Sequence, residues 1–255
     1  MSENNLHISP RAAFVAGAVG GILLLGTIGF VVLALRGRSA SIGATGKDTT
    51  QPVAQPSLRA PSLAPSGTAS VDISNVNIKG QPFIGKANAP TTIAYWYDYQ
   101  CPFCKRSEEE VLPQVMKEYI NTGKVRLVYK DFQFLGPDSQ TAGVAGRAVW
   151  EVAPDKFSQW HKAMYDKQDN ENSGWGSKAD ILALTTSLGI NTAKVEKLMT
   201  TKADQYQKAM DADKAEGNTF GVSGTPSFII GKQLIVGAQP YASLKVAIDE
   251  ALNNK

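Results

Sequence analysis

Residues 91–104, TTIAYWYDYQCPFC, join a β-branched and aromatic run typical of a buried strand directly to two cysteines. Cys101 and Cys104 are the only cysteines among the 255 residues. A strand leading into a helix that begins at Cys101 would give its sulfur unpaired backbone N–H groups and the positive end of the helix dipole. Both stabilise a thiolate, the form that attacks disulfides and leaves from them. Pro102 suits the first helical position, and Cys104 falls on the same helix face as Cys101, so the two can form a disulfide.

Two other uses of the cysteine pair stay open from the residues alone. A zinc site needs four ligands, and the chain has no second CxxC and only two histidines, His7 and His161. A purely structural disulfide would close a very short loop, which stabilises a fold less than closing a long one. The sequence therefore favours a redox-active dithiol and predicts no metal site.

The N-terminal part of the chain predicts a membrane anchor. Residues 1–11 form a short tail, and the 24 residues 12–35 carry no charged side chain. A helix of that length would extend ~36 Å, enough to cross a hydrocarbon core of ~30 Å. A cleaved signal peptide is the alternative, but its apolar region usually has only ~7–15 residues. We therefore expect an uncleaved signal anchor that crosses the cell membrane once as a transmembrane helix.

The charges around the anchor and the chemistry of the cysteines disagree on the side of the membrane that the remaining chain occupies. Arg36, Arg38 and Lys47 follow the anchor and Arg11 precedes it, which by the positive-inside rule places the C-terminal part in the cytosol. Enzymes that make disulfides belong instead in oxidising compartments. On the strength of the chemistry, we expect the catalytic domain to be extracytoplasmic.

The rest of the chain divides into a linker and one domain. Residues 36–72 are rich in Ser, Ala, Pro, Thr and Gly, which predicts a flexible, disordered linker. Residues 73–255 are long enough for one domain with a hydrophobic core. The net charge of +3 and the lack of a dense Lys/Arg run give no support to nucleic-acid binding.

Hydrophobic periodicity in the folded part predicts the order βαβ, a helical block, then ββα. The expected strands are residues 71–78, 91–97, 124–134, 227–230 and 233–236. The expected helices are residues 102–121 (with a kink at Pro113), 139–152, 154–167, 177–188, 192–216 and 241–253. This order is a compact α/β layout with a helical insertion at about residues 137–216.

Three segments resemble DsbA-like thioredoxin-fold oxidoreductases. They are residues 97–104 (YDYQCPFC), 124–132 (KVRLVYKDF) and 221–228 (GVSGTPSF). The resemblance implies an α/β thioredoxin fold with a helical insertion, here preceded by the anchor and the linker. It also implies a thiol-disulfide oxidoreductase that catalyses disulfide formation, and sometimes isomerisation, in bacterial extracytoplasmic proteins.

The resemblance further implies a role for each residue of the site. Cys101 would be the exposed nucleophile, and Cys104 would be the buried partner that resolves mixed disulfides. Pro226 matches the family's cis-proline, which faces the dithiol. Thr225 before it would pair with an extended substrate, as in strand addition, and Phe103 would also contact the substrate.

The chain departs from its relatives around the dithiol. Tyr95 stands where thioredoxins keep a buried acid, six residues before the first cysteine. Asp98 is then the candidate proton acceptor for Cys104, together with Lys130. The alternative for Asp98 is a solvated carboxylate at the end of a strand. His161, in the helical insertion, has no evident partner in the sequence, and we expect it to be structural.

The sequence thus predicts a membrane-anchored enzyme that forms disulfides in exported proteins through its Cys-Pro-Phe-Cys dithiol and needs no cofactor. The expected partners are reduced or unfolded extracytoplasmic proteins and a quinone-linked membrane oxidase of the DsbB or vitamin K epoxide reductase homologue type. Phe103 replaces the histidine of the family's strongest oxidants, which predicts a milder oxidant. Two alternatives stay open: a disulfide reductase or isomerase, and a tethered peptide-binding chaperone module.

Overall fold

A computed structural model describes residues 71–254 of the chain. The predicted tail (1–11), the predicted membrane anchor (12–35) and all but the last two residues of the predicted linker (36–72) lie outside these residues. Among the helices within residues 71–254, none combines the length and the apolar character that crossing a bilayer requires.

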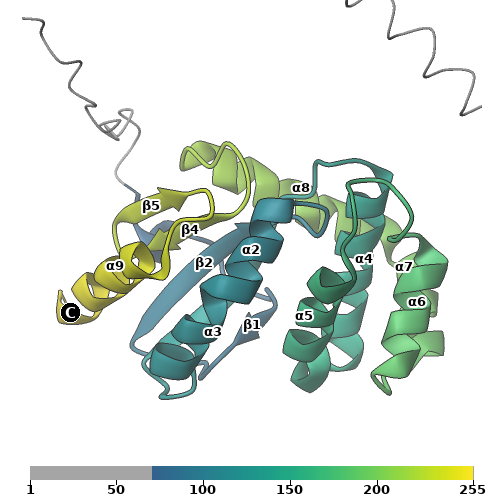
Figure 1. Cartoon of the computed structure of the whole chain (residues 1–255), viewed down its shortest axis with the longest axis horizontal. Coiled ribbons are helices and arrows are strands. Elements are labelled where there is room, and N and C mark those ends of the chain that lie inside the picture. The colour runs from purple at the N-terminus through teal and green to yellow at the C-terminus, as the bar shows by residue number, and fades with distance from the viewer. Residues whose placement is uncertain (1–70, 255) are drawn as a thin grey trace, which may run out of the picture. The chain divides into compact units, whose positions relative to one another are not determined.

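A five-stranded mixed sheet forms the centre of the described domain (Figure 1). The sheet order is β1-β3-β2-β4-β5, in which β2 and β3 pair in parallel and the other neighbours pair antiparallel. The parallel pair requires a crossover connection, and the helical segment that begins at Pro102 supplies it. The strands are β1 (Phe83–Ile84), β2 (Thr91–Tyr97), β3 (Val125–Asp131), β4 (Ser227–Ile230) and β5 (Gln233–Val236).

The central strand β2 is buried on both of its faces because its side chains alternate between two cores. Ile93, Tyr95 and Tyr97 point into the larger core, which lies under the crossover helices and the helical block. Ala94 and Trp96 point into a smaller core on the opposite face. The strand therefore carries an almost unbroken apolar run, as strands covered on both faces do.

The crossover consists of α2 (Pro102–Glu110), α3 (Leu112–Val115) and a π-helical turn, η2 (Met116–Ile120). The single helix predicted for residues 102–121 is thus interrupted, and the predicted kink near Pro113 is confirmed. Pro113 lies in the first turn of α3, where its missing N–H group is tolerated. Helix α2 ends at Glu110, so only Val111 separates the two helices.

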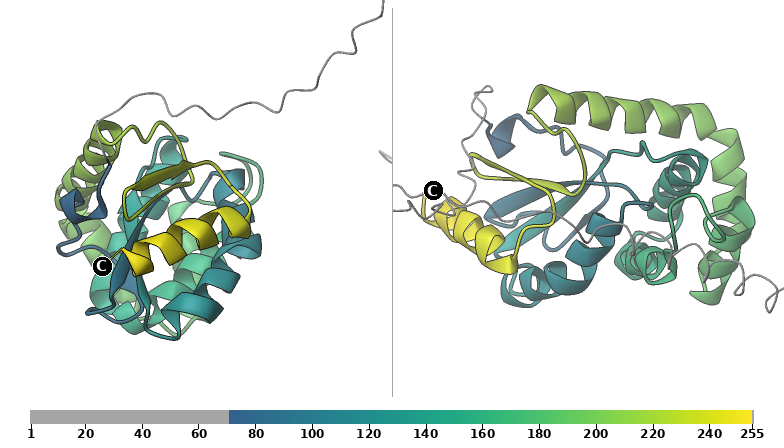
Figure 2. Two further views of the ribbon diagram at one scale, coloured as in Figure 1. Left: turned by 90° about the vertical axis from the view of Figure 1, so that its left-hand side faces the viewer. Right: turned by 45° about the horizontal axis from the view of Figure 1, so that its top comes forward.

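A block of helices lies at one end of the sheet, and one long helix leads back from it to the last strands (Figures 1 and 2). This long helix, α8, covers the face of the smaller core, whereas α2, α3 and α9 cover the larger core. The elements are α4 (Pro137–Val152), a 3₁₀ turn η3 (Pro154–Lys156), α5 (Phe157–Lys167), α6 (Lys178–Ser187), α7 (Thr192–Thr201), α8 (Ala203–Thr219) and the closing helix α9 (Tyr241–Asn253).

The first strand predicted from the sequence, at residues 71–78, is wrong. The segment contains a 3₁₀ turn, η1 (Ile73–Asn75), because the Asp72 carboxylate accepts a hydrogen bond from the backbone N–H of Ser74 at 2.9 Å and caps the turn. Its apolar side chains pack onto the smaller core without pairing to the sheet, and the first strand is β1.

The single helix predicted for residues 192–216 is also wrong. The chain breaks at Lys202, whose backbone (φ −117°, ψ 16°) ends α7, and α8 begins at the next residue. The remaining predictions agree with the structure to within a few residues, and residues 227–230, 233–236 and 241–253 match in full.

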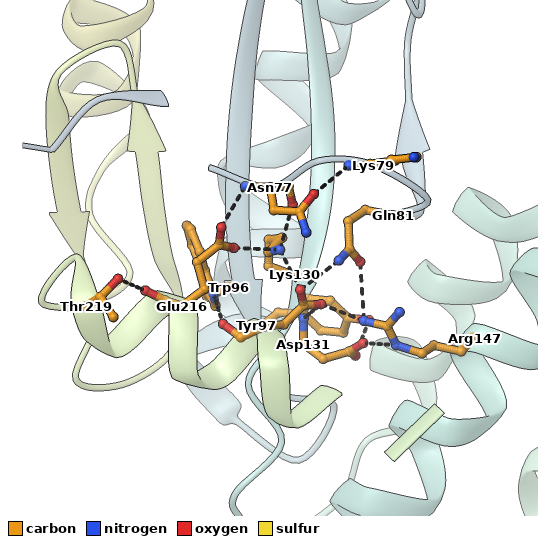
Figure 3. A network of polar contacts seen from close by, with 11 residues as sticks. Asn77, Lys79, Gln81, Trp96, Tyr97, Lys130, Asp131, Arg147, Glu216 and Thr219 are labelled. Carbon is orange, nitrogen blue, oxygen red and sulfur yellow. Dashed lines mark hydrogen bonds and ion pairs between the residues drawn. The ribbon is translucent and has the colours of Figure 1, made fainter. Parts of the chain in front are cut away.

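A buried network of charged side chains joins α4 and α8 to strand β3 (Figure 3). Arg147 of α4 donates to Asp131 of β3 at 2.6 Å and to Asp213 of α8 at 2.5 Å. Lys130 of β3 pairs with the other oxygen of Asp213 at 2.5 Å and with Glu216 at 2.8 Å. Each buried charge therefore has an opposite charge beside it, and the network holds three elements in one arrangement.

Replacing Arg147 with methionine is expected to lower the free energy of unfolding by about 3–5 kcal/mol, because two buried carboxylates lose a partner. The control is Lys162→Met, which breaks the surface pair with Asp166, whose two side chains are 57% and 50% exposed. That change is expected to stay below about 1 kcal/mol. Urea denaturation of both variants measures the difference, and equal losses would contradict a special role for the buried network.

Candidate active site

Cys101 lies at the N-terminus of α2, as the sequence predicts. Its backbone is extended (φ −78°, ψ 116°), and the helix begins at Pro102. Cys101 is only 4% exposed, so it is buried, and the prediction that it is an exposed residue is wrong. Cys104, one turn into the helix, is 0% exposed, and both cysteines are in the free thiol form. The two sulfurs thus differ in access, and the first is the one nearer to solvent.

Hydrogen bonds around Cys101 lower the pKa of its thiol from 9.0 to about 6. The largest contribution is the hydrogen bond with the Cys104 thiol, and burial opposes it. The side chain of Thr225 and the backbone N–H groups of Cys104 and Phe103 lower the pKa further. A thiol with this pKa is mostly thiolate at neutral pH, so Cys101 is activated both for attack and for departure.

The pKa of the Cys104 thiol is shifted in the opposite direction, upward. Burial, followed by the neighbouring Cys101 sulfur, raises the pKa of its thiol well above 9.0. The reduced site therefore holds one anion, on Cys101, and one neutral thiol that donates to it. This division is compatible with the roles that the family resemblance implies, and those roles stay predictions.

The loop before β4 faces the dithiol. The Thr225–Pro226 peptide bond is cis, as the resemblance implies. The Cys101 Sγ atom lies 3.3 Å from the Thr225 carbonyl oxygen, to which it donates while it is protonated. The Thr225 hydroxyl is buried and has no other hydrogen-bond partner among residues 71–254, so it is available to the Cys101 thiolate. Pro226 is fixed from the other side because its carbonyl accepts from the Gly237 N–H at 2.7 Å.

Asp98 is fully buried, and the alternative of a solvated carboxylate is wrong. Burial raises the pKa of its carboxyl group, and the hydrogen bonds that it accepts act against this shift. None of these hydrogen bonds comes from Cys104, and Lys130 pairs with other carboxylates, so the role of Asp98 as a proton acceptor stays a prediction. The donors, at 2.7–3.1 Å, are the backbone N–H groups of Gln100, Phe134 and Leu135 and the Ser139 hydroxyl.

A second polar cluster, which the sequence did not reveal, lies under the dithiol. Tyr95, at the position of the missing acid, is buried beside Cys104, and its hydroxyl has no other hydrogen-bond partner within residues 71–254. Glu108, one helical turn after Cys104, has its carboxylate 2.9 Å from the Nε2 atom of His161. The Nδ1 atom of His161 lies 2.9 Å from the Tyr99 hydroxyl. His161 therefore has two polar partners that the sequence did not reveal, and the expectation that it is structural stays a prediction.

Residues around the site also fix its entrance. Phe103 is 56% exposed, and the Arg106 guanidinium lies 5.3 Å from the centre of its ring, so an apolar face stands next to Cys101. Gln168, which follows α5, donates to the carbonyl oxygens of Tyr99 at 2.7 Å and of Cys101 at 3.1 Å. No pattern in the sequence indicated Gln168, because it reaches the site from the helical block.

No three His, Cys, Asp or Glu side chains within residues 71–254 are grouped so that they could hold a metal ion.

A family model described as Thioredoxin matches residues 77–250 of the chain. The chain belongs to the thioredoxin family. The matched range includes the dithiol, the cis-proline loop and the whole helical block.

Several proteins with a related sequence are disulfide bond formation proteins. Disulfide bond formation protein D of Bacillus subtilis (strain 168) is 30% identical over 182 residues, which are 70% of this chain and 80% of that protein. A probable disulfide bond formation protein D of Bacillus anthracis is 32% identical over 184 residues, covering 68% and 78% of the two chains.

Two solved structures of related proteins have the same fold. The crystal structure of oxidised BdbD from Bacillus subtilis matches with a TM-score of 0.65 and 26% identity, covering 73% of this chain and 98% of that one. The thiol-disulfide exchange protein alpha-DsbA2 from Wolbachia pipientis matches with a TM-score of 0.59 and 27% identity, over 67% and 86%. This member of the thioredoxin family is a thiol-disulfide oxidoreductase.

Titrating the reduced protein by its ultraviolet thiolate absorbance is expected to show a transition at about pH 6 that disappears in Cys101→Ser. Because this pKa is lower in the folded chain than in the unfolded chain, the thiolate contributes stability that is fully present above pH 9.0. That stability is lost as the pH falls through about 6. A midpoint near the ordinary value of 9.0 would contradict the activation of Cys101.

Proposed function

We propose that this protein catalyses disulfide bond formation in exported proteins, with its catalytic domain on the extracytoplasmic side of the cell membrane. The observation that carries the proposal is the asymmetry of the Cys-Pro-Phe-Cys dithiol. A low thiol pKa stabilises the reduced form of the enzyme, because Cys101 is then released as a stable thiolate. A dithiol with a stabilised reduced form takes electrons from its substrates and so oxidises them.

The reaction proceeds in two exchanges. A substrate thiolate attacks the Cys101 sulfur of the oxidised enzyme, the Cys101–Cys104 bond breaks, and Cys104 takes the electron pair. A second substrate thiolate then attacks the substrate sulfur of the mixed disulfide, and Cys101 leaves as a thiolate. The substrate gains one disulfide, and the enzyme gains two electrons as its reduced dithiol.

The loop at Thr225 and the ring of Phe103 are the proposed substrate contacts. The Thr225 carbonyl oxygen lies 3.3 Å from the Cys101 sulfur, so an extended peptide paired to this backbone would place its own cysteine at the dithiol. The exposed face of Phe103 supplies apolar contact without a demand for a particular sequence. Such contacts suit an enzyme that acts on many unfolded chains.

The N-terminal sequence supports a domain that stays at the membrane, next to the partner that we propose, whereas the side of the membrane follows from the chemistry of the dithiol. An anchor at residues 12–35 and a linker at residues 36–72 would keep the domain close to the membrane surface. A quinone-linked membrane oxidase could then reoxidise the dithiol without a diffusing carrier. Two alternatives were predicted from the sequence. In a reductase or isomerase the cysteines would reduce or rearrange disulfides, and in a chaperone they would not be needed for activity.

The wild-type protein is expected to oxidise reduced, unfolded ribonuclease and to react only slowly with the disulfides of insulin. A variant with Cys101→Ala and Cys104→Ala is expected to lose ribonuclease oxidation completely, since no sulfur remains to exchange. Ribonuclease activity and insulin turbidity measure the two directions. Fast insulin reduction without ribonuclease oxidation would favour a reductase, and unchanged suppression of aggregation by the alanine variant would favour a chaperone.

Protease treatment of intact spheroplasts is expected to remove the catalytic domain, because an oxidising enzyme belongs on the outer side of the membrane. A cytosolic marker protein in the same sample is the control and must survive. If the domain is cleaved only after the membrane is broken, the positive charges that follow the anchor determine the topology. The extracytoplasmic location would then be wrong.

A further inference from the structure

We propose that Tyr95 and the Glu108–His161 pair form the proton-transfer site of Cys104, and so replace the acid that this chain lacks at position 95. Tyr95 would donate a hydrogen bond to the Cys104 thiolate, and the pair would exchange the proton. The inference rests on thiol-disulfide exchange and is independent of the direction and cellular location proposed above.

Cys104 needs such a site because it has no access to solvent. The residue is 0% exposed, and burial raises the pKa of its thiol. Each time the enzyme disulfide opens or closes, this sulfur must gain or lose a proton inside the protein. Asp98 is poorly placed for the task, because its carboxylate already accepts four hydrogen bonds that fix the neighbouring loops.

Tyr95 has the properties of a donor to the Cys104 thiolate. Its hydroxyl is fully buried, lies beside the Cys104 sulfur, and has no other hydrogen-bond partner among the described residues. A buried hydroxyl without a partner is costly unless some state of the protein uses it. Burial, followed by the charges of Cys104 and Glu108, raises the pKa of this phenol, so Tyr95 keeps its proton and can stabilise a thiolate only as a donor.

Glu108 has the position of the proton acceptor. It follows Cys104 by four residues on α2, so the Cβ atoms of the two residues are ~5–6 Å apart on one helix face. That separation allows proton transfer through one water molecule or after rotation of the carboxylate. One carboxylate oxygen is held by His161 at 2.9 Å, and the other has no hydrogen bond within residues 71–254. The side chain is 8% exposed, which gives the proton a route to solvent.

His161 is placed to pass a proton to and from the carboxylate, because its Nε2 atom lies 2.9 Å from a Glu108 oxygen. An imidazole and a carboxylate that share a hydrogen bond can hold one proton between them. The remaining titratable groups that face Glu108 are phenols, which keep their protons because burial raises the pKa of each one. They are Tyr95 of β2, Tyr99 before α2, Tyr129 of β3 and Tyr165 of α5.

These groups account for each proton that Cys104 gains or loses during the exchange. When an incoming thiolate bonds to Cys101, the Cys101–Cys104 bond breaks and Cys104 receives the electron pair. The Tyr95 hydroxyl donates to this anion, the Glu108–His161 pair delivers a proton to it, and the pair recovers a proton from solvent. When the enzyme is reoxidised, the Cys104 thiol returns its proton to the pair before its sulfur attacks.

Glu108→Gln tests the proposal, with Glu109→Gln as the matched control, since Glu109 is the exposed neighbour on the same helix. The readout is the single-turnover reduction of the enzyme disulfide by dithiothreitol, followed across pH. We expect Glu108→Gln to slow this step about a hundredfold and to remove one ionisation from the pH profile, with partial recovery in Glu108→Asp. The Cys101 transition is expected to stay at about pH 6 in every variant.

Tyr95→Phe provides an independent second test because it removes only the hydroxyl. The expected result is a slower dithiothreitol reaction and a higher pKa for Cys104, measured in Cys101→Ser. An unchanged rate and pH profile in Glu108→Gln, or an unchanged Cys104 titration in Tyr95→Phe, would overturn the proposal. Because dithiothreitol reports exchange alone, failure to oxidise ribonuclease would count against the proposed function and leave this inference standing.

Discussion

The hydrogen bonds that converge on the Cys101 sulfur hold a negative charge at the start of α2, and the surrounding structure serves to keep them aligned. Strand β2 ends shortly before Cys101, and its pairing with β3 and β4 fixes its position in the sheet. The helical block holds the connecting loop, since Tyr165 donates to the Asp98 carbonyl at 3.1 Å and Gln168 donates to the carbonyls of Tyr99 and Cys101. An insertion far along the sequence thus positions the reactive sulfur.

The opposite face of the sheet shows how closely α8 must approach it. The Trp96 indole donates to the Asp213 carbonyl at 2.9 Å, and a Cβ atom at Gly217 would lie 2.7 Å from the same indole nitrogen. Only glycine fits at this position of α8.

Burial raises the pKa of the Asp213 carboxyl to about 6, while Lys130 and Arg147 lower it. Two opposite charges therefore stabilise one buried carboxylate.

Much of the fold could be predicted from local signals, and most of the site could not. Strands β4 and β5 follow from two short apolar runs around Gly231, and Cys101 at a helix N-terminus follows from its neighbour Pro102. Residues 71–78 have apolar spacing typical of a strand, but a capping carboxylate decides their conformation. The spacing of Glu108 from Cys104 was visible, whereas its contact with His161, 53 residues away, exists only after folding.

The low accessibility of Cys101 limits the shape of any chain that can reach its sulfur. Cys101 is 4% exposed, and its sulfur lies 3.3 Å from the Thr225 carbonyl oxygen, so a narrow, extended stretch of polypeptide reaches it most easily. A cysteine on a compact, folded surface is surrounded by its own neighbours and meets them with a steric collision. Under the proposed function, this geometry favours the oxidation of chains that have not yet folded over that of folded proteins.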